Sequence, residues 1–405
     1  MQNRKWLYLL PIVLALAAAL AFTLRVRYMA NAPAPEAPVE EAEPTPEPTP
    51  TPTPEPNYPA GPAVTVDGHL LASGSVLIAD TPCVAVDEFG EAAGFADLTE
   101  TDNTASFTWR TRPVEIVTFD KTLRYGDKET ALSVPAASWH GRLWVPAESF
   151  SEALEIGFFN DEEEQHLYCT PGAGDWEVPE GYVVPCLMYH GVGNDAWSAA
   201  ELFVSPEAME EQIQFLLDNG WDPIWFSDLE HVQDYDKPIL LTYDDGLSDN
   251  YTDLFPLVQK YNIKVTCFVC PRFIEDNDRN YMKADAIREM SESGLVEIQS
   301  HSYTHHPEIY ALSDKELLHQ LADSQLYLLR LTGKESYVFC YPCGSESKHV
   351  REVMLDYYRF GVKMGGRCYV TGDDPTLIYR IYVKRGFYGP GLGRLLDAAL
   401  AKLEN

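Results

Sequence analysis

Leu241-Thr242-Tyr243-Asp244-Asp245-Gly246 is the most informative stretch of this 405-residue chain. A short apolar run that ends at a turn residue is typical of a buried strand. Neighbouring residues of a strand point to opposite sides, so the end of this strand aims two carboxylates at different partners. We therefore expect a strand that ends at a site where two acids have different tasks.

A second polar stretch, Ser300-His301-Ser302-Tyr303-Thr304-His305, follows further along the chain. Histidines at i and i+4 share one face of a helical turn, an arrangement that suits a single metal ion. One aspartate and two histidines leave coordination positions open for water or substrate, as hydrolytic metal sites require. The other aspartate is then free to act as a base. The alternative is a solvated turn with two incidental histidines.

Strands and helices alternate from about residue 181 to the carboxyl terminus. The expected strands are Val183–Tyr189, Pro238–Tyr243, Lys264–Cys270, Val296–Ser300 and Tyr337–Tyr341, and the expected helices are Pro206–Asn219, Asp249–Tyr261, Lys283–Ser293 and Asp314–Leu331. This alternation favours a parallel α/β sheet, for which a closed barrel is the natural solution. In barrels the chemistry lies on loops that follow the strands, where both motifs fall.

With these motifs in this order, segment 180–405 resembles the polysaccharide deacetylase family, which is the NodB homology domain or carbohydrate esterase family four. The family pattern combines T-[FY]-D-D-G at a strand end with H-[ST]-x-x-H in a turn. The resemblance implies a distorted (β/α) barrel and a metal-dependent hydrolase of acetamide C–N bonds. Its substrate would be the N-acetylhexosamine units of peptidoglycan or an exopolysaccharide, and it would release acetate. The cofactor would be one divalent ion, expected to be Zn, with Co, Ni or Fe as alternatives.

The resemblance also assigns roles to residues. Asp245, His301 and His305 would hold the ion, and Asp244 would take the proton as water attacks an acetamide carbonyl. In the family a backbone N–H of the R-x-P-Y-G motif stabilises the oxyanion. The matching segment here is Cys340-Tyr341-Pro342-Cys343-Gly344, and its backbone donor would be Cys343.

Two parts of the family pattern are replaced. Cys340 stands where the family has the arginine that orients the catalytic aspartate; Arg380 is the best substitute, and a plain surface arginine is the equal alternative. The late L-x-H motif has no counterpart, because no histidine follows His349. His190 is the candidate acid that protonates the departing amine, with a structural histidine as the alternative. Its L-x-Y-H context resembles a subgroup that acts on poly-N-acetylglucosamine and shares both departures.

The amino-terminal segment 1–31 predicts an uncleaved transmembrane anchor. Trp6–Leu24 carries no charge and approaches the roughly 20 apolar residues that span a bilayer. A weak cleavage-like site at Ala30-Asn31-Ala32 leaves secretion of a cleaved form as the alternative. Segment 32–62 is rich in Pro, Glu and Thr and predicts a stiff, extended linker. We therefore expect a single-pass protein of the cell membrane with extracellular carboxyl-terminal domains.

Segment 63–171 predicts a small α+β domain with a faint internal duplication. Glu88–Phe95 is echoed by Ser149–Leu154, and each copy is expected to be a short helix after an apolar strand. The segment resembles the copper amine oxidase N-terminal-like stalk domain of bacterial surface proteins. Despite that name its histidines are scattered, so we expect a spacer or wall-contacting module without a metal.

The cysteines leave three possibilities open. Cys267-x-x-Cys270 and Cys340-x-x-Cys343 have the spacing of a four-cysteine zinc site, but both pairs fall in expected strands, where i and i+3 diverge. Outside the cytoplasm disulfides are possible, and Cys270 and Cys343 would both lie near the barrel mouth. Buried free thiols are an equal alternative.

The charge balance excludes one class of partner. The chain has 62 Asp and Glu against 30 Lys and Arg, a formal charge of −32, which argues against binding to nucleic acid. Two functions remain: an N-deacetylase of cell-wall or extracellular polysaccharide, and a catalytically weak or inactive wall-binding protein on the same barrel. The complete Asp244, Asp245, His301 and His305 set favours the enzyme, and the altered third motif favours the binder.

Overall fold

A computed structural model describes residues 56–101, 104–170 and 177–403 of the chain. Pro56–Asn405 forms one compact unit. The predicted anchor (1–31) and most of the predicted linker (32–62) lie outside the described residues. Within the described ranges, no helix combines the length and the apolar character needed to cross a membrane.

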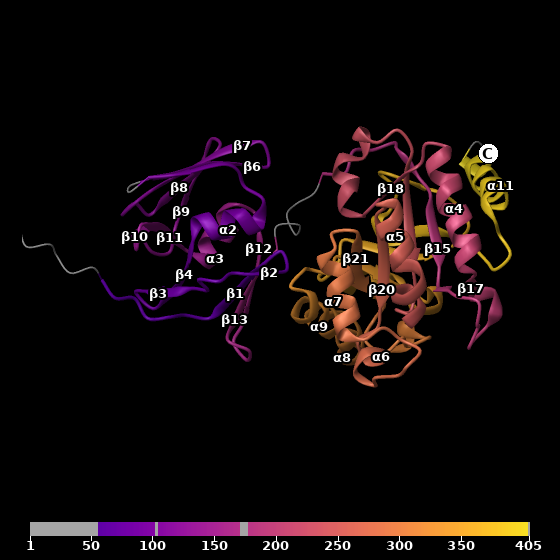
Figure 1. Ribbon diagram of the computed structural model, residues 1–405. Coiled ribbons are helices and arrows are strands. Elements are labelled where there is room, and N and C mark those ends of the chain that lie inside the picture. Colours follow the sequence, from indigo (N-terminus) through magenta and orange to yellow (C-terminus); the bar gives the residue numbers. More distant parts are fainter. Residues whose placement is uncertain (1–55, 102–103, 171–176, 404–405) are drawn as a thin grey trace, which may run out of the picture. The chain divides into compact units, whose positions relative to one another are not determined.

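The first part of the described chain is a small α+β structure (Figure 1). Its elements are β1 (Ala63–Val66), β2 (His69–Leu70), β3 (Val76–Ile78), β4 (Thr81–Ala85), α2 (Val86–Ala93), β5 (Ala96–Glu100), β6 (Thr104–Trp109), β7 (Arg112–Val117), β8 (Thr122–Tyr125), β9 (Lys128–Ala131), β10 (Ala137–Trp139), β11 (Arg142–Pro146), α3 (Ala147–Ala153), β12 (Gly157–Asp161) and β13 (His166–Thr170). They form sheets in the orders β12-β13-β1-β2, β10-β11-β4-β3 and β5-β6-β7-β8-β9.

The internal duplication expected from the sequence is present as two strand–helix units. Strand β4 runs directly into α2, and β11 runs directly into α3. The two strands pair antiparallel, with Val84 opposite Val145. Phe89 of α2 and Phe150 of α3 are both fully buried, and their rings meet edge to face at 5.2 Å. The repeated Phe in each echo therefore builds the core shared by the two units.

The second part contains a parallel barrel wrapped by helices (Figure 1). Its strands are β14 (Val183–Val184), β15 (Cys186–Tyr189), β16 (Gly191–Val192), β17 (Phe203–Val204), β18 (Asp222–Ile224), β19 (Pro238–Tyr243), β20 (Val265–Val269), β21 (Val296–Ser300), β22 (Val338–Cys340), β23 (Phe360–Met364), β24 (Tyr369–Val370) and β25 (Ile378–Tyr382). Its α-helices are α4 (Pro206–Asp218), α5 (Phe255–Tyr261), α6 (Pro271–Glu275), α7 (Ala284–Glu292), α8 (Asp314–Leu318), α9 (Ser324–Thr332), α10 (Lys348–Met354) and α11 (Gly389–Leu400).

The barrel closes through seven parallel strands in the order β15-β25-β23-β22-β21-β20-β19, and β19 returns to β15. Strand β18 pairs with β19 outside this ring. All six residues of β19 are buried, as expected for a strand covered on both faces. The parallel barrel predicted from the alternation of elements is confirmed. Because all strands run the same way, the ends of β15, β19, β21, β22 and β25 meet at one mouth.

Most expected strands and helices agree with the structure within one or two residues. Expected strand Val183–Tyr189 is split at Pro185, which cannot donate a ladder hydrogen bond. The expected helix Asp249–Tyr261 contains a π segment, Asn250–Leu254, before α5, and the expected helix Asp314–Leu331 contains another between α8 and α9. Strands β23 and β25 were not predicted, because a basic residue interrupts the apolar run of each.

Candidate active site

Loops that follow β19, β21 and β22 meet at the barrel mouth with unusual backbone geometry. Asp245, His305 and Cys343 have φ values of 72°, 54° and 55°, in the left-handed region that non-glycine residues avoid. Gly246 also has a positive φ of 68°, and a Cβ there would lie 2.8 Å from a methyl carbon of Val269. Strained backbone of this kind is held by its surroundings and gathers at functional sites.

The histidine stretch is not a helical turn, so that expectation was wrong. Residues 301–306 contain no helix, and Ser302 takes a positive φ of 62° in addition to His305. The Oγ of Ser302 accepts a hydrogen bond from the backbone N–H of His305 at 3.0 Å, and Gln320 accepts from the backbone N–H of Thr304 at 3.0 Å. A looped backbone, and not helical periodicity, brings the two imidazoles together.

Asp245, His301 and His305 form a cluster that can hold a metal ion. Oδ1 of Asp245 lies 3.4 Å from Nε2 of His301 and 3.4 Å from Nε2 of His305. The candidate ligand atoms all lie within 4.8 Å of one another, and two imidazoles with one carboxylate are a common donor set for zinc and similar ions. The cluster is partly exposed through Asp245 and His305, so further positions stay open to water or substrate.

Neighbouring groups orient the proposed ligands. Nδ1 of His301 lies 2.8 Å from the backbone carbonyl of Cys340, which leaves Nε2 directed at Asp245. Burial and the charge of His301 lower the pKa of His305 to about 4, which favours the neutral form that binds metals. Burial opposes the positive charge of His301, yet the nearby Cys340 and Asp245 raise its pKa well above the ordinary value. A cation in the cluster would therefore compete with a proton on His301.

Asp244 is clamped by a buried arginine, and its carboxylate also lies within 4.8 Å of a candidate ligand atom of His301. Its Oδ1 and Oδ2 accept hydrogen bonds from Nη1 and Nη2 of Arg380 at 2.6 and 2.7 Å. Both side chains are buried, with exposed fractions of 4% for Asp244 and 2% for Arg380. Burial alone would raise the pKa of Asp244, but Arg380 outweighs it and holds that pKa below its usual range. Asp244 is thus kept ionised.

Arg380 reaches Asp244 from β25, two strands away from β22 in the barrel order. Its Nη1 also donates to Oγ1 of Thr242 at 3.0 Å, and its Nη2 donates to Sγ of Cys340 at 3.1 Å. Cys340 occupies the position of the motif's arginine, and its small side chain leaves room for the guanidinium that arrives from β25. The alternative of a plain surface arginine is excluded by its burial.

His190 follows β15 at the same mouth. Its Nε2 lies 4.0 Å from Oδ2 of Asp244, and its backbone carbonyl accepts a hydrogen bond from Asn250 at 2.8 Å. Its Nδ1 is buried and makes no hydrogen bond within the described residues. The imidazole therefore faces Asp244 and can exchange a proton with a group bound beside both side chains.

Cys343 lies in the turn Pro342–Gly344 directly after β22. Its side chain is exposed, unlike the other seven cysteines, and all eight are free thiols. The described residues contain no four-cysteine cluster, so the zinc ribbon is not formed. The structure thus brings His190, Asp244, Asp245, His301, His305 and Arg380 together at one mouth, with Cys343 on the adjoining turn. Sequence reasoning missed Thr242 and the thiol of Cys340, because their contacts with Arg380, and that of Cys340 with His301, join distant segments of the chain.

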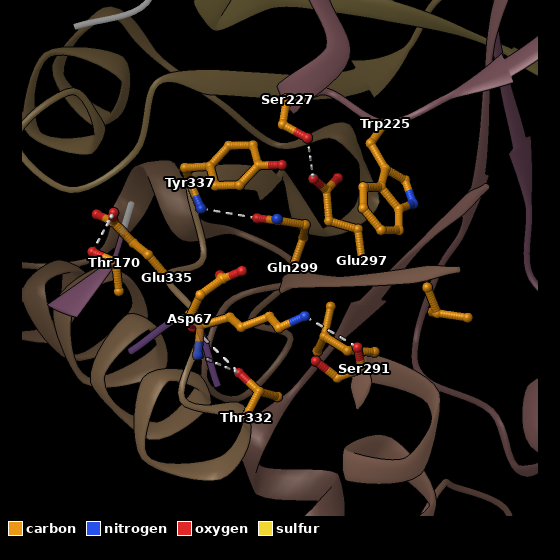
Figure 2. A pocket seen from close by; sticks show the side chains of 13 residues that line it. Asp67, Thr170, Trp225, Ser227, Ser291, Glu297, Gln299, Thr332, Glu335 and Tyr337 are labelled. Carbon is orange, nitrogen blue, oxygen red and sulfur yellow. Dashed lines mark hydrogen bonds between the residues drawn. The ribbon is translucent and has the colours of Figure 1, made fainter. Parts of the chain in front are cut away.

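A separate pocket lies at the opposite end of the strands (Figure 2). Glu297, near the start of β21, contacts Oγ of Ser227 at 3.3 Å, and Gln299 accepts from the backbone N–H of Tyr337 at 2.9 Å. Burial raises the pKa of Glu297 to about 8. Because Asp244 and His301 follow the other ends of β19 and β21, this pocket is not part of the metal-ligand cluster.

Comparison with known proteins matches residues 231–359 to the model of the polysaccharide deacetylase family. The curated relatives include YxkH of Bacillus subtilis strain 168, provisionally named a polysaccharide deacetylase; it is 24% identical over 53% of this chain and 76% of its own. The poly-β-1,6-N-acetyl-D-glucosamine N-deacetylase of Escherichia coli strain K12 is 26% identical over 33% of this chain. That match spans only 22% of the Escherichia coli protein.

Solved structures share the fold. A deacetylase of Streptococcus pyogenes, solved with acetate, superimposes with a TM-score of 0.50 at 20% identity, over 53% of this chain and 98% of its own. A polysaccharide deacetylase of Bacillus cereus gives a TM-score of 0.50 at 18% identity, over 74% of this chain and 98% of its own. Residues 231–359 of the barrel therefore match the polysaccharide deacetylase family, whose members hydrolyse C–N bonds, and the barrel has the fold of these two solved deacetylases.

Proposed function

We propose that the protein is a metal-dependent N-deacetylase of N-acetylhexosamine units in cell-wall or extracellular polysaccharide. One observation carries the proposal: the adjacent carboxylates have separate partners. Asp245 lies 3.4 Å from two imidazole nitrogens, whereas Asp244 forms two hydrogen bonds with Arg380. One acid is thus available as a ligand and the other as a base.

A divalent ion held by Asp245, His301 and His305 would supply Lewis-acid activation of water and of the acetamide carbonyl. Asp244 accepts the proton of the attacking water. Arg380 keeps Asp244 charged but lowers its basicity. Proton transfer to Asp244 therefore requires a water whose own pKa is lowered. With the ion activating the water and Asp244 accepting its proton, a buried base with a lowered pKa can still act.

The later steps fall to the remaining mouth residues. The backbone N–H of Cys343 is assigned to the oxyanion that forms on the carbonyl. His190, 4.0 Å from Asp244, protonates the departing amine so that the sugar leaves as a free amine and the acetyl group as acetate. Arg380 is a positioning residue, because it acts through Asp244.

A non-catalytic polysaccharide-binding protein is the second candidate. It was favoured by the loss of the third motif's arginine. Arg380 supplies a bidentate partner for Asp244 from another strand, which removes the main argument for inactivity. The ion is proposed to be zinc, and the substrate to be a β-linked N-acetylglucosamine polymer.

The test is acetate release from N-acetylglucosamine oligomers by the purified chain. We expect release that a chelator abolishes and that added Zn²⁺ restores. Absence of acetate with every tested metal, alongside retained binding of the oligomer, would instead establish the binding protein.

The remaining regions are proposed to place the barrel outside the cell. Segment 1–31 would anchor the chain in the membrane, and segments 32–62 and 63–171 would serve as a linker and a stalk-like spacer. The protein should fractionate with membranes, and added protease should reach the barrel on wall-stripped cells. A soluble mature form that begins near Pro33 would show a cleaved signal instead.

A further inference from the structure

A row of aromatic side chains leads away from the metal-ligand cluster. The ring of His305 lies 6.2 Å from that of Phe273 in α6, and Phe273 stacks on Tyr281 at 4.2 Å. Tyr281 meets Trp197 edge to face at 5.7 Å, and Trp197 is the most exposed member, at 42%. No role in the proposed reaction uses this row, although it begins at a proposed metal ligand.

The segment that carries Tyr281 is tied to the loop of the candidate active site that follows β19. Tyr281 forms an antiparallel bridge with Leu247, two residues after Asp245. The backbone N–H of Met282 donates to Gly246 at 2.9 Å, and that of Ser248 donates to Asn280 at 2.8 Å. The segment that carries Tyr281 is thereby held beside the metal-ligand loop.

Trp197 belongs to the loop that follows His190. This loop runs from β16 to β17, and its ends are closed by the pairing of Gly191 with Phe203 and of Val192 with Val204. The ring of Trp197 packs edge to face on buried Phe203 at 5.8 Å, and this contact fixes its position. Among the described residues, 42% of Trp197 remains exposed.

We propose that Trp197, supported by Tyr281, forms a sugar subsite, in which its exposed ring stacks on a pyranose ring of the substrate chain beside the unit that is deacetylated. The inference rests on the proposed function and specifies its substrate as a polymer, because three successive ring contacts separate Trp197 from His305. Flat aromatic faces bind the C–H faces of rings at little cost in conformational entropy.

The occupant follows from the position and charge of the row. The row begins at His305, so a polymer bound at the barrel mouth can extend along it. In the proposed reaction, the part of the polymer that lies on the row is the sugar next to the one that is deacetylated. Asp195 and Glu201 on the same loop are exposed acids, and the chain as a whole has a formal charge of −32. This surface complements a chain that gains ammonium groups as acetyl groups are removed.

The test compares Trp197→Ala with the wild-type protein on β-linked N-acetylglucosamine oligomers of two and six units. We expect the KM for the hexamer to rise about tenfold relative to that for the dimer, which corresponds to about 1.4 kcal/mol. Trp197→Phe should restore most of the difference, because it keeps a ring face. Tyr182→Ala is the matched control: its side chain is 36% exposed, and it precedes β14 at the opposite end of the barrel.

A binding measurement separates this inference from the proposed function. Asp244→Asn protein, which cannot take the proton, is titrated with the hexamer by calorimetry, with and without Trp197→Ala. The inference requires weaker hexamer binding in the double variant, even if no deacetylation is ever observed. An unchanged hexamer affinity and an unchanged KM ratio would overturn the subsite.

Discussion

Replacing Arg380 with Met tests how the candidate active site keeps Asp244 charged. The substitution keeps an unbranched, apolar side chain that is shorter than arginine, and it removes both charge-assisted hydrogen bonds, at 2.6 and 2.7 Å. The carboxylate then stays buried without a partner. Breaking a buried ion pair from one side costs about 3–5 kcal/mol of folding free energy.

The sign of the pH dependence should reverse. In the wild type the pKa of Asp244 lies below its unfolded value near 3.8, so its contribution to stability is present above that pH and is lost only in strong acid. Without Arg380, burial dominates and raises the pKa above 3.8. The variant should therefore become less stable as the pH rises above 3.8. Its acetate release should fall by roughly 10²–10⁴-fold, with the acidic limb of the pH profile shifted upward.

Urea unfolding at pH 5 and pH 8, together with acetate release across that range, measures both effects. Arg367→Met is the matched control, because Arg367 is exposed and its guanidinium lies 4.3 Å over the ring of Tyr379. Arg380→Lys keeps a charge without the bidentate fork and supplies a folded intermediate case. If Arg380→Met matches the control in both assays, the clamp does not govern Asp244 and the reasoning fails.

Three further outcomes follow, two from the candidate active site and one from the pocket at the other end of the strands. Asp244→Asn should keep its metal and lose activity by roughly 10²–10⁴-fold, whereas Asp245→Asn should lose metal and activity together; loss of metal from the Asp244→Asn variant in a metal-content assay would reverse the two roles. His301→Ala leaves two protein ligands and should lose most bound zinc after dialysis, so tight retention of one equivalent would refute the ligand set. Glu297→Gln should leave stability unchanged near pH 4 and raise it progressively up to pH 8, by at most a few kcal/mol, because the wild-type carboxyl with its pKa of about 8 resists ionisation as the pH rises. Equal urea midpoints for the Glu297→Gln variant and the wild-type protein at pH 8 would show that Glu297 is not held protonated.

The sequence predicted those parts of the site that depend on local patterns. The apolar run before Asp244 identified β19, and the alternation of elements identified the parallel barrel with its chemistry at one mouth. Separate partners for Asp244 and Asp245 were expected from strand geometry, but both residues follow the end of β19, and Asp245 has a left-handed φ of 72°. The structure agrees on the strand and the barrel, because both depend on patterns that are local in the chain.

The remainder depends on contacts between distant segments. Arg380 is 136 residues from Asp244, and only the strand order of the closed barrel brings β25 beside β15. The histidine stretch looked helical because i and i+4 spacing fits a helix, yet hydrogen bonds to Ser302 and Gln320 hold it as a loop. The exposure of Trp197 and its ring contacts likewise correspond to no periodic pattern in the sequence.

The position of Arg380 on β25 also affects the order in which the protein is made. Strand β25 is the last strand of the barrel in the sequence and pairs with β15, the first strand of the closed ring. During synthesis Asp244 leaves the ribosome long before its guanidinium partner does. Until β25 is added, the barrel is open and the Asp244 carboxylate stays hydrated, because no guanidinium is present to pair with it. The barrel therefore closes in the same step that orients the proposed base. A chain truncated before β25 would carry every proposed metal ligand but no ordered base.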